Sequence, residues 1–132
     1  MEKTRANIAC KTALVVHPDI EALTVFQSAL NQNGIQTILA RDLPTALLAI
    51  TQHYFEVAIV SSRISDEGDG WPLAGVLRMA FPQSHISVIA PQTGVLELKS
   101  AINQGISSIH EHSTSPEEVV TSALATSPAH LQ

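Results

Sequence analysis

One short segment, residues 57–61 with the sequence Val-Ala-Ile-Val-Ser, constrains the fold more than any other part of the chain. Four apolar residues follow one another there without a polar interruption. A strand with one exposed face alternates apolar and polar residues, whereas an uninterrupted apolar run is typical of a strand buried on both faces. Such strands lie inside parallel sheets that helices cover on both sides. The segment therefore predicts a central strand that ends at Ser61.

Segments of two kinds alternate along the rest of the chain. Further apolar, strand-like runs are found at residues 13–16, 35–40, 86–90 and 106–109. Apolar residues at helical spacing predict helices over residues 20–30, 42–50, 71–81 and 96–103, and one from residue 115 onward. Each of the five strands is thus followed by a helix, and right-handed crossovers place such helices on both faces of the sheet. The pattern predicts an α/β fold with a doubly wound five-stranded parallel sheet.

Residues typical of helix ends stand where these boundaries fall. Gly34 suits a left-handed C-terminal cap, and Gly105 closes the fourth helix in the same way. Asp42 offers an N-cap with Pro44 in the following turn. Residues 115–118, Ser-Pro-Glu-Glu, have the pattern of a capping box. These signals support the helix assignments independently of the apolar pattern.

The length indicates one domain. A chain of 132 residues, 45% of them hydrophobic, is enough for one core and too short for two ordinary domains. We expect an N-terminal extension over residues 1–11, the folded domain over residues 12–125, and a C-terminal tail or the start of a linker over residues 126–132.

Charge and cysteine content exclude several classes of protein. The formal net charge is -5 and the chain has only seven lysines and arginines, so we expect no nucleic-acid binding by this domain. The single Cys10 cannot form an internal disulfide. The sequence contains no apolar segment long enough for a signal peptide or a membrane span. These features favour a reducing, cytoplasmic location and no membrane contact.

In doubly wound folds, ligands and chemistry gather beyond the carboxyl ends of the strands. The residues expected at that edge are 17–19 (His-Pro-Asp), 61–62 (Ser-Ser), 90–91 (Ala-Pro) and 110–112 (His-Glu-His). The candidate functional site is therefore predicted among these four segments.

Three segments give the chain a resemblance to a known family. Residues 69–82 run Asp-Gly-Trp-Pro-Leu-Ala-Gly-Val-Leu-Arg-Met-Ala-Phe-Pro, and Gly105 and residues 115–118 follow at the expected distances. In this order and spacing, residues 12–125 resemble the receiver domain of two-component response regulators, the CheY-like family. The resemblance implies a (βα)5 flavodoxin-like three-layer sandwich that takes part in phosphorelay signalling.

The residues that hold magnesium and accept the phosphoryl group in that family are replaced here. An acidic pair after the first strand, which would supply oxygen ligands to the hard dication, corresponds to His17 and Pro18. Asp19 stands one place further on. The acceptor aspartate corresponds to Ser61, whose hydroxyl is a weak nucleophile unless a base activates it. We therefore expect neither an aspartyl phosphate at this position nor magnesium bound in the family's manner.

The residues that would sense the phosphoryl group are also replaced. The switch threonine or serine corresponds to Ala90, the lysine to His112, the following proline to Ser113, and the switch aromatic to Ile109. Because every position of this pocket differs from the residue typical of the family, we interpret the chain as a pseudo-receiver without enzymatic activity and without a cofactor.

By the same resemblance, such a domain dimerises or holds a protein partner through the fourth helix, fifth strand and fifth helix. An output domain would follow in a longer chain. In this sequence the predicted contact face runs through Leu96, Lys99, Ile102, Ile109, Glu117, Val120 and Leu124. Its apolar helical members also suit core positions, and only their exposure separates the two interpretations.

A second hypothesis assigns the crevice a ligand. His17, His110 and His112 could stand near Asp19 and Ser61, and imidazole with a carboxylate can hold a transition metal or respond to pH. No metal-binding signature surrounds them, so we assign no metal ligands. Catalysis by Ser61 is disfavoured, because it lacks the Gly-x-Ser-x-Gly turn of hydrolases.

Overall fold

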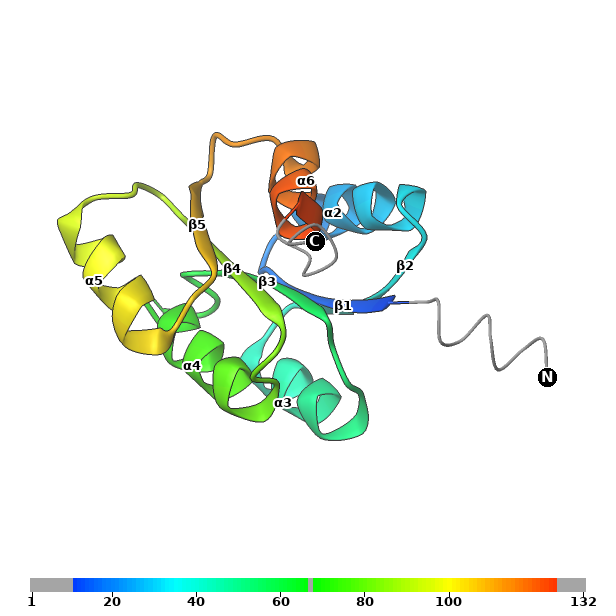
Figure 1. Cartoon of the computed structure of the whole chain (residues 1–132), viewed down its shortest axis with the longest axis horizontal. Helices are drawn as coiled ribbons and strands as arrows, with labels where there is room; N and C mark the ends of the chain where they lie inside the picture. Colours follow the sequence, from blue (N-terminus) through cyan, green and yellow to red (C-terminus); the bar gives the residue numbers. More distant parts are fainter. Residues whose placement is uncertain (1–10, 67, 126–132) are drawn as a thin grey trace, which may run out of the picture.

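Five parallel strands form one sheet in the computed structural model, which describes residues 11–66 and 68–125. The strands are β1 (Lys11–Val16), β2 (Ile35–Ala40), β3 (Val57–Ser61), β4 (His85–Ala90) and β5 (Ser108–Glu111). The helices are α2 (Ile20–Gln32), α3 (Leu43–Gln52), α4 (Gly70–Ala80), α5 (Val95–Gln104) and α6 (Pro116–Ala125). Strands and helices alternate strictly along the chain, as predicted (Figure 1).

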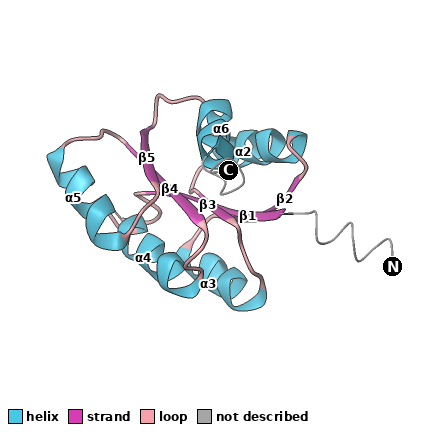
Figure 2. Ribbon diagram, viewed as in Figure 1, coloured by secondary structure: helices cyan, strands magenta, loops and turns pink. Residues whose placement is uncertain are grey.

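The sheet lies between two layers of helices. Helices α2 and α6 cover one face, and α3, α4 and α5 cover the other (Figures 1 and 2). The strand order is β2-β1-β3-β4-β5, so the chain reverses direction across the sheet between β1 and β3. The predicted doubly wound, three-layer α/β fold is confirmed. Its switch point lies where the carboxyl ends of β1 and β3 meet, which is where such folds place their sites.

Strand β3 is the centre of the sheet, as its apolar run predicts. All five of its residues are buried, and it pairs with β1 on one side and β4 on the other. Its side chains divide between two apolar clusters. Ala58 and Val60 pack with the residues of α3 and α4, while Val57 and Ile59 pack with those of α2 and α6. The uninterrupted apolar sequence serves both clusters, because successive residues of a strand point to opposite faces.

The predicted helix caps form. Gly34 and Gly105 adopt the left-handed conformation, with φ of 77° and 69°. The Asp42 carboxylate accepts a hydrogen bond of 2.8 Å from the Thr45 N–H at the start of α3. The Ser115 hydroxyl accepts one of 3.2 Å from the Glu118 N–H in α6. Local sequence therefore fixes where these helices begin and end.

Strand β5 begins later than the sequence predicts. It covers Ser108–Glu111 and not residues 106–109. The Ile106 N–H donates to the Ala101 carbonyl and closes the end of α5, so this residue belongs to the helix terminus and not to the strand. Strand β1 begins at Lys11, the last residue of the predicted extension over residues 1–11. The rest of that extension and the predicted tail over residues 126–132 lie outside the described residues. Within the described ranges, the helices are too short or too polar to cross a membrane.

Candidate functional site at the carboxyl ends of the strands

Two histidines face each other at the predicted edge of the sheet. His17 follows β1 and His112 follows β5, and their ring centroids lie 6.3 Å apart with the planes tilted by 42°. Backbone hydrogen bonds hold both positions: the His17 N–H donates to the Ala40 carbonyl at 3.1 Å, and the His112 N–H donates to the Ala90 carbonyl at 3.0 Å. The topology therefore brings together two residues that are almost a hundred positions apart in the sequence.

The environment of His17 favours its neutral form. Burial lowers the pKa of His17 below its usual value, the neighbouring His112 lowers it further, and Asp19 partly opposes both effects. The Nδ1 atom of His17 accepts a hydrogen bond of 3.1 Å from the Asp19 N–H, so this nitrogen carries no proton in the structure. A neutral imidazole therefore occupies the place where the family resemblance would put a carboxylate.

Asp19 is engaged in the helix that follows it. Its Oδ1 atom accepts a hydrogen bond of 3.1 Å from the Glu21 N–H, which makes Asp19 the N-cap of α2. The side chain is exposed, and Pro18 before it is partly buried. Asp19 thus serves a structural role that its place one residue before the helix explains.

The Ser61 hydroxyl is turned back into its own turn. Its Oγ donates to the Arg63 carbonyl at 2.7 Å, and the Arg63 N–H lies 3.3 Å from the same oxygen. Ser61 is 2% exposed, so its hydroxyl is buried as well as bonded. The hydroxyl proton is thus donated to a backbone carbonyl and not to a base, so this hydroxyl is not activated for nucleophilic attack.

Ser62, which the sequence places at this edge together with Ser61 but to which it assigns no role, lines the crevice. It borders a cavity of about 160 Å³ together with Ala90, Pro91, Trp71 and Glu97. Its N–H donates to the Ile89 carbonyl at 2.8 Å, which continues the β3–β4 pairing one residue past the strand. The alternation of side chains along an extended segment was the available signal, because only one of two adjacent serines can face the crevice.

The loop after β3 is folded around the Asp69 carboxylate. The N–H groups of Ile64, Ser65 and Asp66 donate to it at 2.6, 2.8 and 3.0 Å. Burial would raise the pKa of Asp69, but the backbone hydrogen bonds outweigh burial and lower it. Gly70 packs so closely on β3 that a Cβ there would lie 1.9 Å from the Ser61 carbonyl oxygen. The Asp-Gly pair of the family resemblance thus fixes the loop to the strand end.

Ala90 and Ile109 complete the strand ends with aliphatic groups. Ala90 is fully buried at the end of β4, and Ile109 is partly buried on β5. Neither side chain can donate a hydrogen bond to an anion. His110 lies on β5 as well, but its Nε2 atom is 3.2 Å from the Ser108 hydroxyl and away from the pair formed by His17 and His112.

The predicted crevice is therefore assembled only in part. Of the trio His17, Ser61 and His112, the structure brings the two histidines together, whereas the Ser61 hydroxyl is bonded to Arg63. Within residues 11–66 and 68–125, no three His, Cys, Asp or Glu side chains lie close enough to hold a metal ion.

The predicted contact face needs one correction. Leu96, Lys99, Ile102 and Glu117 are exposed, and Ile109 and Leu124 are partly buried. Val120 is only 1% exposed, because it belongs to the apolar cluster between the sheet and helices α2 and α6. It cannot touch a partner without unfolding α6, so it does not belong to a contact face.

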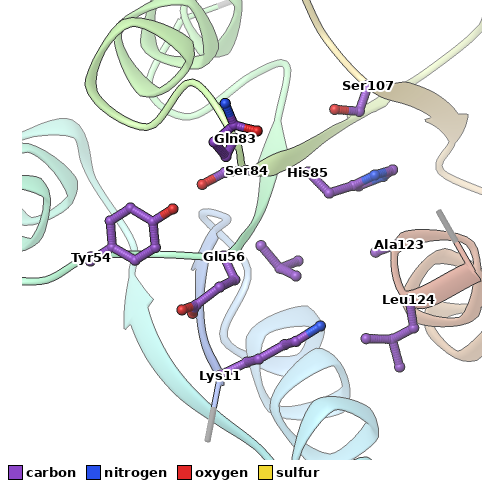
Figure 3. Close-up of a pocket in the computed structure, with 10 residues that line it drawn as sticks. Lys11, Tyr54, Glu56, Gln83, Ser84, His85, Ser107, Ala123 and Leu124 are labelled. Carbon is purple, nitrogen blue, oxygen red and sulfur yellow. The ribbon is translucent and has the colours of Figure 1, made fainter. Parts of the chain in front are cut away.

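A second hollow, of about 460 Å³, lies near the amino ends of the strands and is lined in part by Lys11, Tyr54, Glu56 and His85 (Figure 3). Several of its polar groups are bonded within the fold. A Glu56 oxygen accepts from the Thr12 N–H at 2.8 Å, and the Ser84 hydroxyl donates to the Phe55 carbonyl. This hollow lies at the opposite end of the strands from the candidate site.

The fold is that of response regulator receiver domains. No protein-family model and no curated protein sequence matches the chain. Among solved structures, a response regulator from Burkholderia pseudomallei, described with a phosphorylated aspartic acid, superimposes with a TM-score of 0.79 and 20% identity over 92% of this chain and 71% of that one.

Two further structures agree. A CheY-like receiver domain protein from Methanospirillum hungatei JF-1 gives a TM-score of 0.80 with 16% identity, covering 89% of this chain and 93% of that one. The chemotaxis protein CheY4 of Vibrio cholerae gives 0.81 with 17% identity, covering 90% and 100%. Similarity at these identities establishes the fold, and function has to be argued from the site.

Proposed function

We propose that this chain is an atypical receiver domain of two-component signal transduction, which acts as a protein-protein interaction or dimerisation module without being phosphorylated. The observation that carries the proposal is the end of β3, where Ser61 and Ser62 are buried hydroxyls and Ser61 is bonded to the Arg63 backbone. The receiver fold supports a role in phosphorelay signalling, and the strand-end residues support its independence from phosphate.

The chemistry of this edge argues against phosphoryl transfer. An acyl phosphate requires a carboxylate acceptor, and magnesium requires hard oxygen ligands beside it. The residues present are a neutral His17, Pro18 and a helix-capping Asp19. We accordingly propose no enzymatic activity, no magnesium of the family type and no other cofactor.

Partner binding would use the exposed surface of α5, β5 and α6. Leu96, Lys99 and Glu117 are its exposed members, with Ile109 partly exposed between them. An output domain in a longer chain is one form that a partner could take. A cytoplasmic location, which the lone Cys10 favours, belongs to the same proposal.

Incubation with magnesium and acetyl phosphate or beryllofluoride tests this function. Intact mass and amide NMR shifts at Ser61, Ser62 and Ala90 are recorded, with an aspartate-bearing receiver domain as the positive control. We expect no phosphoryl adduct and no shift changes at these residues. A labile adduct, or clear shifts at the strand ends, would contradict the proposal.

The histidine pair favours a second candidate function, which is sensing of pH or of a small ligand by His17 and His112. It rests on their 6.3 Å separation and on the lowered pKa of His17. Titration with Zn²⁺, followed through the ring C–H signals of both histidines, tests it. Binding that is lost in His17→Gln but kept in His53→Gln, an exposed control, supports this candidate, whereas unchanged signals exclude metal sensing.

A further inference from the structure

Helix α5 turns its apolar side chains toward solvent. Val95, Leu96, Leu98 and Ile102 are all exposed, and Ala101 is its one buried residue. A helix that covers a sheet ordinarily does the opposite, because burial of its apolar stripe holds it in place. Positions 95, 98 and 102 fall on one side of a helix with 3.6 residues per turn, so these exposed side chains form a stripe.

Polar contacts hold α5 in place. At its start, the Glu97 carboxylate caps the helix by accepting a hydrogen bond of 2.9 Å from the Gly94 N–H, and the preceding Thr93 hydroxyl donates to the Glu111 carboxylate of β5 at 3.1 Å. At its end, the Arg78 guanidinium of α4 donates to the Gly105 carbonyl at 2.8 Å and to the Ser107 hydroxyl at 2.9 Å. These contacts tie both ends of α5 to neighbouring elements, so its exposed apolar residues are not what attaches it to the domain.

The exposed stripe continues onto α4. Helix α4 packs beside α5, and Val76 and Met79 of α4 line a groove of about 520 Å³ together with Ile102. We call the exposed apolar surface of the two helices the α4–α5 face. It consists of Val76, Met79, Val95, Leu96, Leu98 and Ile102, which are between 41% and 83% exposed.

The area and charge of this face suit a protein interface. Its exposed apolar area is on the order of 700 Å², above the roughly 300–600 Å² of the largest patch on a typical monomer and near the roughly 800 Å² that each partner buries in a stable interface. The charged side chains of the two helices are Glu97, which is engaged at Gly94, Arg78, which is engaged at Gly105, and Lys99. In a chain of net charge -5, this face is therefore a region of low electrostatic repulsion between copies.

We propose that the α4–α5 face joins two copies of this chain in a two-fold dimer, with α5 antiparallel to α5 of the second copy. The stripe is self-complementary about a point between positions 98 and 99. An antiparallel pair places Val95 against Ile102 and Leu98 against the aliphatic stem of Lys99, whose ammonium group reaches the solvent at the rim. This inference rests on the interaction role proposed above and names the partner and the surface.

Sedimentation equilibrium of the full chain over a concentration series tests the dimer. We expect a species of twice 14.1 kDa, and at least a hundredfold weaker association in Ile102→Glu and in Leu98→Glu. Leu48→Glu is the matched control, because Leu48 is an equally large, exposed residue on α3. It should leave the dissociation constant unchanged. Circular dichroism establishes that each variant is folded.

A cysteine cross-link tests the geometry. In a Cys10→Ser background, Leu98→Cys should form a disulfide-linked dimer under mild oxidation far faster than Leu48→Cys. Equal rates at the two positions would overturn the antiparallel pairing of α5.

The outcomes separate this inference from the proposed function. A wild-type chain that stays monomeric up to millimolar concentration overturns the dimer, even where no phosphoryl adduct forms. If Glu117→Lys dissociates the dimer and Ile102→Glu does not, the α4–α5 face is not the dimer interface. The contact then lies on β5 and α6. A monomeric chain that binds another protein through Ile102 overturns the choice of partner. A phosphoryl adduct, by contrast, refutes the proposed independence from phosphorylation, whether the chain is a monomer or a dimer.

Discussion

Helices α2 and α5 both carry apolar residues at helical spacing, but those of α2 face the core whereas those of α5 face the solvent. Helix α2 buries Leu23, Phe26, Ala29 and Leu30 against the sheet and α6. Helix α5 buries Ala101 alone and exposes four larger apolar residues. The periodicity of apolar residues thus indicates that a helix forms and that it has an apolar face. The tertiary structure determines whether that face packs on the core or is exposed to solvent.

The position of each helix in the fold explains the difference. Helix α2 lies over β1 and β2, next to α6, where a second helix and two strands enclose its apolar face. Helix α5 lies beside β5, a four-residue edge strand of partly buried and exposed residues. An edge strand this short offers little apolar surface to cover, so the apolar residues of α5 have no counterpart within the domain.

We expect the largest effect, a loss of stability, when one apolar residue of α2 is replaced and the result is compared with the same change in α5. Phe26→Ala should lower the free energy of unfolding by about 3–5 kcal/mol, because it leaves a cavity in the core. Ile102→Ala should change it by less than about 0.5 kcal/mol, because this side chain is already exposed. Urea unfolding at a concentration where the chain is monomeric measures both. A large loss in Ile102→Ala under those conditions would show that α5 is attached by its apolar residues after all.

The next effect concerns the polar attachment of α5. Arg78→Met removes hydrogen bonds from the guanidinium to Gly105, Pro82 and Ser107, and should cost about 2 kcal/mol. Amide hydrogen exchange should rise in α5 and stay unchanged in α2. Arg63→Met, at an exposed arginine on the loop after β3, is the control. Equal protection of α5 in both variants would contradict this account of its attachment.

A smaller effect is expected at the cap of α2. Asp19→Ala removes the hydrogen bond to the Glu21 N–H and should cost about 1 kcal/mol. Exchange should increase only in the first turn, since the core residues hold the rest of α2. Asp19→Asn should retain most of the stability, because an amide oxygen also caps a helix. If Asp19→Asn lost as much stability as Asp19→Ala, the negative charge of Asp19 would have a role in the crevice.

The smallest expected effect is a pH dependence of the stability, which arises from two histidines near α6. Burial lowers the pKa of both His85 and His110 below the usual histidine value, and each histidine lies 3.2 Å from the Ser108 hydroxyl. The unfolded chain therefore binds more protons than the folded one just below pH 6.5, so stability should fall as the pH drops from 6.5.

Urea midpoints between pH 7.5 and 5 check this dependence. His85→Gln should flatten it, although not fully, since His17 and His110 also have a lowered pKa. The Ile102→Ala variant should keep the wild-type dependence, because α4 and α5 contain no histidine. Stability that rises toward acid pH would contradict the assignment of these histidines as neutral.

The sequence predicted most of the fold, because strong local signals determine it. The limits of β2 and β3 agree with those expected from their apolar runs, and Gly34, Asp42 and Gly105 cap helices as predicted. The start of β5 was wrong, because Ile106 is apolar and yet closes α5 through its N–H. A backbone hydrogen bond that closes a helix end leaves no mark in an apolar pattern.

The site was predicted less completely. The topology rule placed His17 and His112 at one edge, and the structure brings them together. The direction of the Ser61 hydroxyl depends on the turn after β3, which sequence spacing does not determine. The family resemblance placed both Val120 and Ile102 on a contact face, and helical periodicity alone could not tell that Val120 is buried and Ile102 exposed.

Sedimentation equilibrium of the wild-type chain, with and without magnesium and acetyl phosphate, is the decisive test of phosphate-independent association. We expect a dimer with the same dissociation constant in both conditions, because the surface that associates is permanently exposed and the strand ends accept no phosphoryl group. A chain that is monomeric alone and dimeric with acetyl phosphate would contradict it, and would make the domain a phosphorylation-dependent switch.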